Sequence, residues 1–165
     1  MIRKIAKKMI RLIFTLVAKK KLGSYGDNLR VNFPCKFTGN THVGNSCNFN
    51  GFQVHGAGKV VIGNYFHSGK DILVITENHN YEGELIPYDK TTVKKNVVIE
   101  DCVWLGSRVT LCGEVTLGEG CIIQAGSVVV GDIPKYGIAG GSPAKVFKYR
   151  DAEHYEKLKS DSKFF

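Results

Sequence analysis

The sequence lacks any CxxC pair, and its five cysteines are an odd number. This pattern excludes a disulfide framework and a paired-cysteine zinc site. Cys35, Cys47 and Cys121 fall at the small positions of a repeat described below, where a small apolar side chain packs well. We therefore interpret these residues as reduced core thiols, and we expect a cytoplasmic protein.

Negative charge is absent from residues 1–21, which carry eight lysine and arginine residues. From residue 22 onward, basic and acidic residues number fifteen each, so the net charge of +8 comes from the first segment. A basic body would indicate nucleic-acid binding. Because the body is neutral, we predict no nucleic-acid partner.

Residues 2–21 also lack a long apolar run and a signal-peptide cleavage site. Arg11 interrupts the apolar residues, and the run is shorter than the ~20 residues that a spanning helix needs. The helical period predicts an amphipathic helix within residues 1–24. It would pack on the N-terminal end of the fold or lie on an anionic membrane surface, and the two are compatible. Its apolar stripe is Ile2, Ile5, Met9, Leu12 and Leu16, broadened by Ile10, Ile13 and Val17.

A period of six organises residues 97–129. Small or β-branched residues follow each main apolar position by four, and we expect Gly106 and Gly118 to mark sharp turns. Such hexapeptide repeats are typical of a parallel β-helix, in which three hexads form one coil and residues eighteen apart stack. The main positions are Ile99, Leu105, Leu111, Leu117, Ile123 and Val129.

The repeat is weaker elsewhere and fails between Val74 and Ile99, where polar residues and Pro87 predict a projecting arm at about 76–96. A loop of this length is more often functional than not. We therefore divide the chain into a basic amphipathic helix (1–24), a β-helix with its arm (25–144) and a C-terminal tail that forms a short helix (145–165).

Four motifs occur in a fixed order: Val103-Trp-Leu-Gly-Ser107, Gln124-Ala-Gly-Ser127, Asp132-Ile-Pro134 and Gly140-Gly-Ser-Pro-Ala-Lys-Val146. Together they resemble the hexapeptide-repeat acyltransferases, above all the galactoside, maltose and polysaccharide O-acetyltransferases. The resemblance covers about residues 60–150. It implies an all-β, left-handed parallel β-helix, a homotrimer, and acetyl-CoA bound as co-substrate in the groove between neighbouring prisms.

His79 lies in the predicted arm, where this family carries its catalytic histidine. Acetyl transfer to an alcohol requires removal of the hydroxyl proton as the oxygen attacks the thioester. A neutral imidazole is the natural general base for that step. The family often orients this base through a carboxylate or a main-chain carbonyl, and Glu82 is the candidate here.

The resemblance also implies a set of CoA-contacting residues. Lysines stand where galactoside-type relatives have arginines near the CoA phosphates, so the charge is kept without the bidentate fork. Val130-Gly131 replaces a Thr-Lys dipeptide of those relatives, which removes one side-chain contact. The set comprises Trp104, Gly106 and Ser107 in one coil, Ala125 and Gly126 in the next, and the basic pair Lys145 and Lys148.

We predict an acetyl-CoA-dependent acetyltransferase that acts on a sugar hydroxyl of a surface polysaccharide (capsule, O-antigen or exopolysaccharide) or its precursor. Asn48 and Asn50 are the candidate acceptor-binding residues. The basic helix could place this cytoplasmic enzyme on the inner face of the membrane. N-acetylation of an amino-sugar nucleotide and a non-catalytic, membrane-docked solenoid are the alternatives. A further alternative is a zinc carbonic anhydrase, because some β-helix proteins of that kind bind zinc through three histidines, and this chain has His42, His55 and His67. That family shows a pair of histidines five residues apart, and this sequence has no such pair, so no metal is expected.

Overall fold

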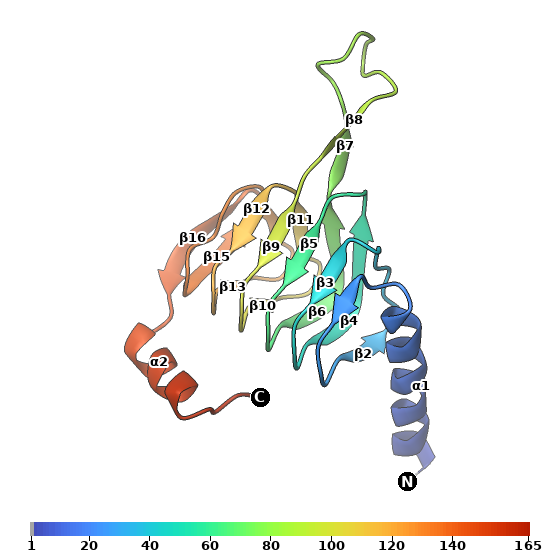
Figure 1. The fold of residues 1–165 in the computed structure, drawn as a ribbon. Coiled ribbons are helices and arrows are strands. Elements are labelled where there is room, and N and C mark those ends of the chain that lie inside the picture. Colours follow the sequence, from blue (N-terminus) through green and yellow to red (C-terminus); the bar gives the residue numbers. More distant parts are fainter. Residues whose placement is uncertain (1) are drawn as a thin grey trace.

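The computed structural model describes residues 2–165, with side chains from Ile5 onward. The predicted side-chain positions of Ile2, Arg3 and Lys4 therefore lie outside the described residues. The chain winds into about six turns of a left-handed parallel β-helix. Figure 1 shows the turns stacked side by side, with one helix at each end and an arm that projects from the side of the stack.

One face of the prism is a five-stranded parallel sheet. Each strand is two or three residues long and pairs in register with the strand of the next turn. In spatial order the strands are β1 (Ser24–Tyr25), β3 (Thr41–Val43), β5 (Val60–Ile62), β9 (Val97–Ile99) and β12 (Val115–Leu117).

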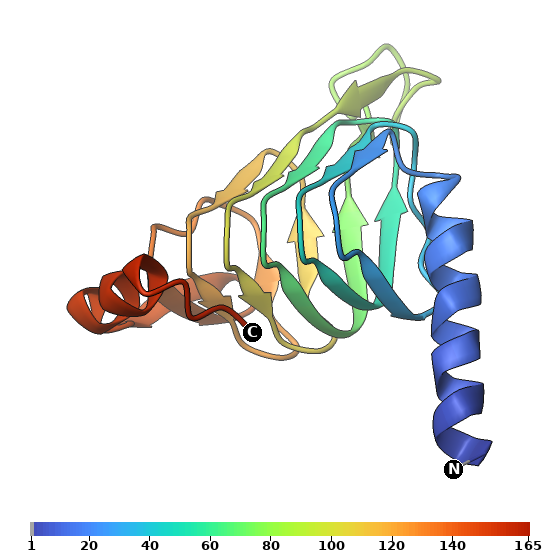
Figure 2. The same cartoon turned by 60° about the horizontal axis from the view of Figure 1, so that its bottom comes forward.

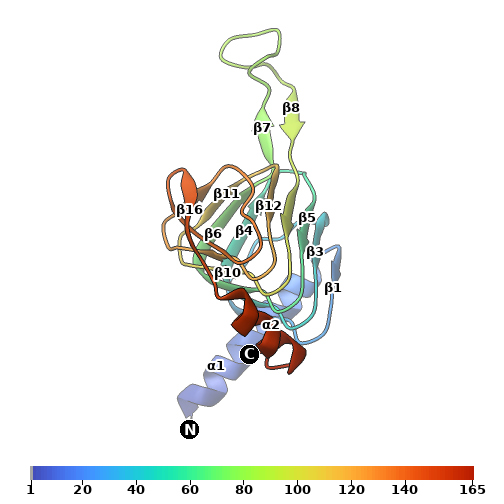
Figure 3. The same cartoon turned by 90° about the vertical axis from the view of Figure 1, so that its left-hand side faces the viewer.

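The other two faces belong to one sheet that bends around a corner. β6 (His67–Ile75) pairs with β10 (Trp104–Leu105) at its start and with β11 (Thr110–Cys112) at its end, so β6 itself spans both faces. Figure 3 looks along the stack and shows the turns superimposed around a shared centre. The remaining parallel strands are β2 (Arg30–Phe33), β4 (Asn48–His55), β13 (Ile122–Ile123), β14 (Val128–Val129) and β15 (Gly137–Gly141).

The predicted register is confirmed. Ile99 pairs with Leu117, Leu105 with Ile123, and Leu111 with Val129, each eighteen residues apart. All six side chains are buried. The core is therefore a column of aliphatic side chains in which each turn covers the apolar layer of its neighbour.

Gly106 and Gly118 have a different role from the predicted one. Neither has a positive φ, so turn geometry does not require glycine at either position. Instead, a Cβ on Gly106 would lie 2.5 Å from the Ala125 nitrogen, and one on Gly118 would lie 2.4 Å from the Lys135 nitrogen. These glycines let successive turns stack closely.

The early turns are wider and are filled by aromatic rings. Phe37, Phe49, Phe52 and Phe66 form a buried cluster with centroids 5.1 to 5.9 Å apart. The six-residue spacing breaks after β4: Lys36 pairs with Gln53, seventeen residues on, whereas Thr41 pairs with Val60, nineteen residues on. Gly56, at φ 97°, lies in this inserted stretch. His55, the polar residue at the break, is exposed.

Helix α1 (Ile2–Lys19) covers the N-terminal end of the prism, but not through its predicted apolar stripe. Phe14, Thr15 and Ala18 face the first turn, and the Thr15 hydroxyl accepts a hydrogen bond from the Val31 N–H at 3.0 Å. That bond satisfies an edge N–H that has no further turn to pair with. No helix within residues 2–165 is long and apolar enough to cross a membrane.

The predicted helix over residues 145–165 is wrong in its first part. Residues 144–149 form β16 (Ala144–Tyr149), which turns back antiparallel along β15 and ends the sheet. The helix α2 (Ala152–Ser160) follows, with Asp151 as its N-cap, accepting from the His154 N–H at 2.9 Å.

Candidate functional site

The arm is a short hairpin of β7 (Glu77–His79) and β8 (Thr92–Lys94), with an irregular tip between them. Asp89 organises the tip: its carboxylate accepts from the Glu84 N–H at 3.0 Å and the Thr91 N–H at 2.8 Å. The Thr91 hydroxyl, followed by these N–H groups, lowers the pKa of Asp89. The charged carboxylate therefore holds the tip together at neutral pH.

His79 is the last residue of β7, opposite Thr92, and its side chain is exposed. Its ring stacks on Tyr88, with centroids 3.9 Å apart and an angle of 9° between the planes. Stacking fixes the plane of the imidazole and leaves its two nitrogens at the ring edge, where they can exchange a proton with a ligand.

Glu77 lies two residues before His79 on β7 and lines the same small hollow. The Thr92 hydroxyl and the Ala57 N–H lower the pKa of Glu77, and the nearby charges of Lys94 and His79 contribute further. Among the described contacts, none joins Glu82 to His79; the Glu82 N–H donates to Asn80 instead. Because the six-residue repeat fails in the arm, the sequence alone could not distinguish Glu77 from the other acidic residues there.

A second feature is a groove at the corner between the last two faces, lined by Lys70, Asp71, Ser107, Arg108, Ala125 and Gly126. The Ser107 hydroxyl accepts from the Lys70 N–H at 3.0 Å, so its own hydrogen is available to a ligand. Gly126 has a φ of 75°, and no heavy atom lies within 4 Å of the position a Cβ would take. The groove is therefore open to a ligand at Gly126.

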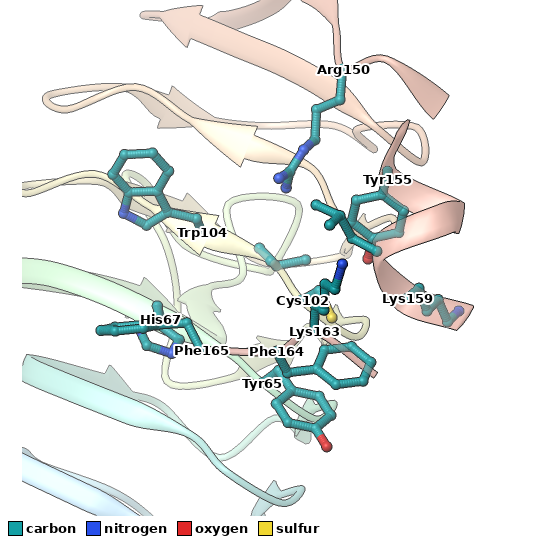
Figure 4. A pocket seen from close by; sticks show the side chains of 12 residues that line it. Tyr65, His67, Cys102, Trp104, Arg150, Tyr155, Lys159, Lys163, Phe164 and Phe165 are labelled. Carbon is teal, nitrogen blue, oxygen red and sulfur yellow. The ribbon is translucent and has the colours of Figure 1, made fainter. Parts of the chain in front are cut away.

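Trp104 lies on the face beside this groove and lines a different pocket. Figure 4 shows its indole across from Tyr65, His67 and the C-terminal residues. Phe164 stacks on Tyr65 at 4.0 Å, and the Phe165 ring lies 5.6 Å from the ring of His67. Sequence reasoning missed this pocket, because its aromatic wall comes from the last residues of the chain.

The two predicted phosphate-binding lysines lie on β16. Lys148 pairs with Ile138, which pairs through Ile122 with Trp104, so Lys148 and Trp104 share one row across the sheet. Lys145 pairs with Gly140, two residues further along β15 and nearer the groove corner. The antiparallel return of the chain therefore places both ammonium groups on the face that adjoins the groove.

Asn48 and Asn50 belong to a polar ladder on the same face. Asn32 donates to the side-chain oxygens of Asn48 (2.6 Å) and Asn50 (3.0 Å), and the amide of Asn50 donates to the Ser68 carbonyl at 2.6 Å. Both ends of the Asn50 amide are therefore engaged within the protein. The one bond of this ladder that involves the Asn48 side chain uses its oxygen.

The predicted residues form two groups within one chain. The arm leaves the prism after β6, whereas the groove lies where β6 turns at Lys70–Asp71, about five residues earlier and ~15 Å away along the strand. His79 lines a small hollow with Gly56, Glu77, Asn78 and Thr92, which shares no residue with the groove. Within one chain, therefore, the imidazole of His79 and the groove are apart.

Metal-ligating residues do not cluster in the part of the chain that the structure describes: no three of His, Cys, Asp or Glu converge there. His42, His55 and His67 lie on three different strands, β3, β4 and β6. His42 instead shares a hydrogen bond with the Ser24 hydroxyl at 2.9 Å.

A left-handed β-helix of hexapeptide repeats, with a histidine-bearing arm and a glycine-lined corner groove, defines a class of acyl-transferring enzymes. The bacterial transferase hexapeptide family (six repeats) matches residues 96–131. The chain is 30% identical to a galactoside O-acetyltransferase of Lactococcus lactis over 154 residues, which cover 87% of this chain and 73% of that protein.

Two further comparisons agree. An Escherichia coli K12 protein, assigned to O-acetyl transfer in lipopolysaccharide biosynthesis, is 42% identical over 64 residues, covering 38% of this chain and 33% of its own. A hexapeptide-repeat acetyltransferase of Vibrio cholerae, solved with acetyl-CoA, superposes with a TM-score of 0.68 at 25% identity, over 81% of this chain and 74% of that one. The chain belongs to the hexapeptide-repeat acetyltransferases.

Proposed function

We propose that this chain transfers the acetyl group of acetyl-CoA to a sugar hydroxyl of a surface polysaccharide or its precursor, with His79 as general base. The observation that carries the proposal is the exposed imidazole of the arm, held flat against Tyr88. The relatives named for galactoside and lipopolysaccharide O-acetyl transfer support a sugar acceptor.

The residues of the groove fit a CoA arm. Gly126 leaves its side of the groove open, Ser107 has a hydroxyl hydrogen to donate, and Ala125 adds only a methyl group. Lys145 and Lys148 supply positive charge on the adjoining face, where phosphates would be stabilised. Trp104 lies on the adjoining face, where it lines the neighbouring pocket rather than the groove.

The chemistry follows from the imidazole. His79 takes the proton of the acceptor hydroxyl while the oxygen bonds to the thioester carbon; the carbon–sulfur bond then breaks, and the proton passes to the leaving sulfur. Such a base contributes about 10²–10⁴-fold to the rate. Glu77 and Thr92 line the hollow in which this imidazole lies.

We also propose that the active enzyme is a homotrimer whose sites are shared between neighbours. The arm and the groove lie on different corners of one prism, so a second copy must bring its arm to the groove. A cyclic trimer would have three equivalent sites, because each chain contributes its arm to one neighbour and its groove to the other.

The test is acetyl-CoA turnover by the purified full-length chain against sugars, nucleotide sugars and lipid-linked glycans. Acetylation of a sugar hydroxyl, detected as an ester by mass spectrometry, supports the proposal. If only the amine of an amino-sugar nucleotide is acetylated, the proposed sugar-hydroxyl acceptor is wrong, whereas the role of His79 as general base still holds. Absence of acetyl-CoA binding by calorimetry would overturn the catalytic proposal altogether.

A further inference from the structure

The outer face of α1 is apolar and uncovered. Ile5, Met9, Leu12 and Leu16 lie along it with exposed fractions of 59%, 60%, 58% and 52%. The exposed side chains of Ile10, Ile13 and Val17 widen the same face. Ile5, Met9 and Leu12 border a hollow whose other wall is Asn28–Arg30, yet more than half of each of these side chains stays exposed. A run of exposed apolar side chains such as this marks an interaction site.

The exposed apolar residues are not those that hold the helix on the prism. The contacts with the prism use the opposite face, through Phe14, Thr15 and Ala18. Figure 2 shows the helix lying along the end turn, with its N-terminal half extending past the prism. The helix therefore caps the solenoid with one side and leaves most of its apolar side exposed.

The charges around this face have one sign. Lys7, Lys8 and Arg11 line the hollows between the helix and the first turn, and Lys19, Lys20 and Lys21 follow at the end of the helix. No acidic residue lies within the first 21 positions. A broad apolar face flanked by cations is the pattern of a helix that lies in the interface of an anionic bilayer.

We propose that α1 docks the enzyme onto an anionic lipid surface, with Met9, Leu12 and Leu16 inserted among the lipids and the flanking lysines paired with headgroups. A second copy of the same face is a poorer partner, because it would bring two sets of cations together without an acid to offset them. The helix lies on the membrane rather than spanning it.

The position of α1 sets the orientation of the bound enzyme. Since the apolar face lies at the N-terminal end of the stack, the membrane meets that end, and the arm projects parallel to the lipid surface. In the trimer proposed above, copies that run parallel would present three such helices at the same end. The second and third helices would then bind with a raised effective concentration.

The test is flotation of the full-length chain with neutral phosphatidylcholine vesicles and with vesicles that also contain phosphatidylglycerol. We expect binding to the anionic vesicles that weakens as salt rises. Replacing Met9, Leu12 and Leu16 together by Gln should remove the binding, with Tm, oligomeric state and acetyl-CoA turnover unchanged. Replacing Lys19, Lys20 and Lys21 by Gln should weaken it by about 10²-fold.

The matched control replaces Leu85 and Ile86, which are exposed at the tip of the arm, by Gln and should float like the wild type. The proposal is overturned if the wild type ignores anionic vesicles at low salt or if the Met9, Leu12 and Leu16 variant still binds. It is equally overturned if that variant changes the oligomeric state, since the face would then pack against a second copy. Turnover measured in the same samples separates these outcomes from a failure of the proposed chemistry.

Discussion

At the scale of single residues, the proposal depends on how one imidazole is held. The sequence placed His79 in the arm, but Tyr88, which stacks on its ring, and Glu77, which lines the same hollow, could not be identified in advance. Their positions depend on the hairpin register that sets His79 opposite Thr92. Glu82 has a similar sequence separation from His79, and its backbone N–H donates to the Asn80 side chain in the tip.

Replacing His79 by Ala should lower kcat by about 10²–10⁴-fold because the hydroxyl proton then has no acceptor. The side chain is exposed on an arm outside the core, so Tm and acetyl-CoA affinity should not change. Steady-state kinetics and calorimetry measure these quantities. His55→Ala, a second exposed histidine, is the matched control, and a His79→Ala enzyme with near-normal kcat would remove His79 from the mechanism.

Glu119 is the residue that fastens α2 to the prism. Its carboxylate binds the ammonium groups of Lys159 and Lys135 and accepts from the Tyr155 hydroxyl at 3.2 Å. Burial alone would raise the pKa of Glu119, but the two lysines lower it overall. Glu119 therefore stabilises the fold above its unfolded pKa, and this contribution is lost as the pH falls through the lowered folded pKa.

Glu119→Gln should cost about 1 kcal/mol at neutral pH, since the lysine partners are partly exposed. The difference in Tm between the wild type and this variant should shrink as the pH is lowered below about 4. Thermal unfolding across the acid range measures it, with Glu84→Gln in the exposed arm as control. A difference that stays constant with pH would assign the effect to shape rather than to charge.

At the scale of elements, the local sequence pattern predicted the stacked strands of the repeat. It did not predict features that depend on contacts with other elements, such as β16 and the orientation of α1. The six-residue spacing was enough for the stacking of Leu105 on Ile123, because in a solenoid sequence distance sets spatial distance. β16 was missed because it is held by antiparallel pairing with β15, a contact outside the period. The amphipathic pattern of α1 predicted a helix but not which face meets the prism, since Thr15 and Ala18 are not conspicuously apolar.

The candidate site was predictable to the same extent. Motif order placed Ser107 and Ala125 in adjacent turns, and the structure brings both into one groove. Trp104 lies instead in the neighbouring pocket closed by Phe164, whose position follows from the course of the C-terminal tail. Tails of this kind leave no periodic signal.

At the scale of the whole molecule, stability is distributed along one column of stacked residues. Leu111 lies between Val74 and Val129, and all three side chains are buried. Leu111→Asp should cost several kcal/mol by burying an unpaired carboxylate between turns. Thr110→Asp, one position earlier and outward-facing, is the control. If Thr110→Asp lowers Tm more than Leu111→Asp does, the register is shifted by one residue.

The central claim is that acetyl transfer uses His79 of one copy at the groove of another. Oligomers assembled from equal amounts of His79→Ala and Ala125→Trp chains test it most directly, because each parent should be inactive, one without the base and the other with a blocked groove. If the site is shared, about one quarter of all sites in the randomly assembled trimers combine an intact arm with an intact groove. Turnover should therefore recover to about a quarter of the wild-type value. Mixed oligomers that stay as inactive as both parents would contradict the account.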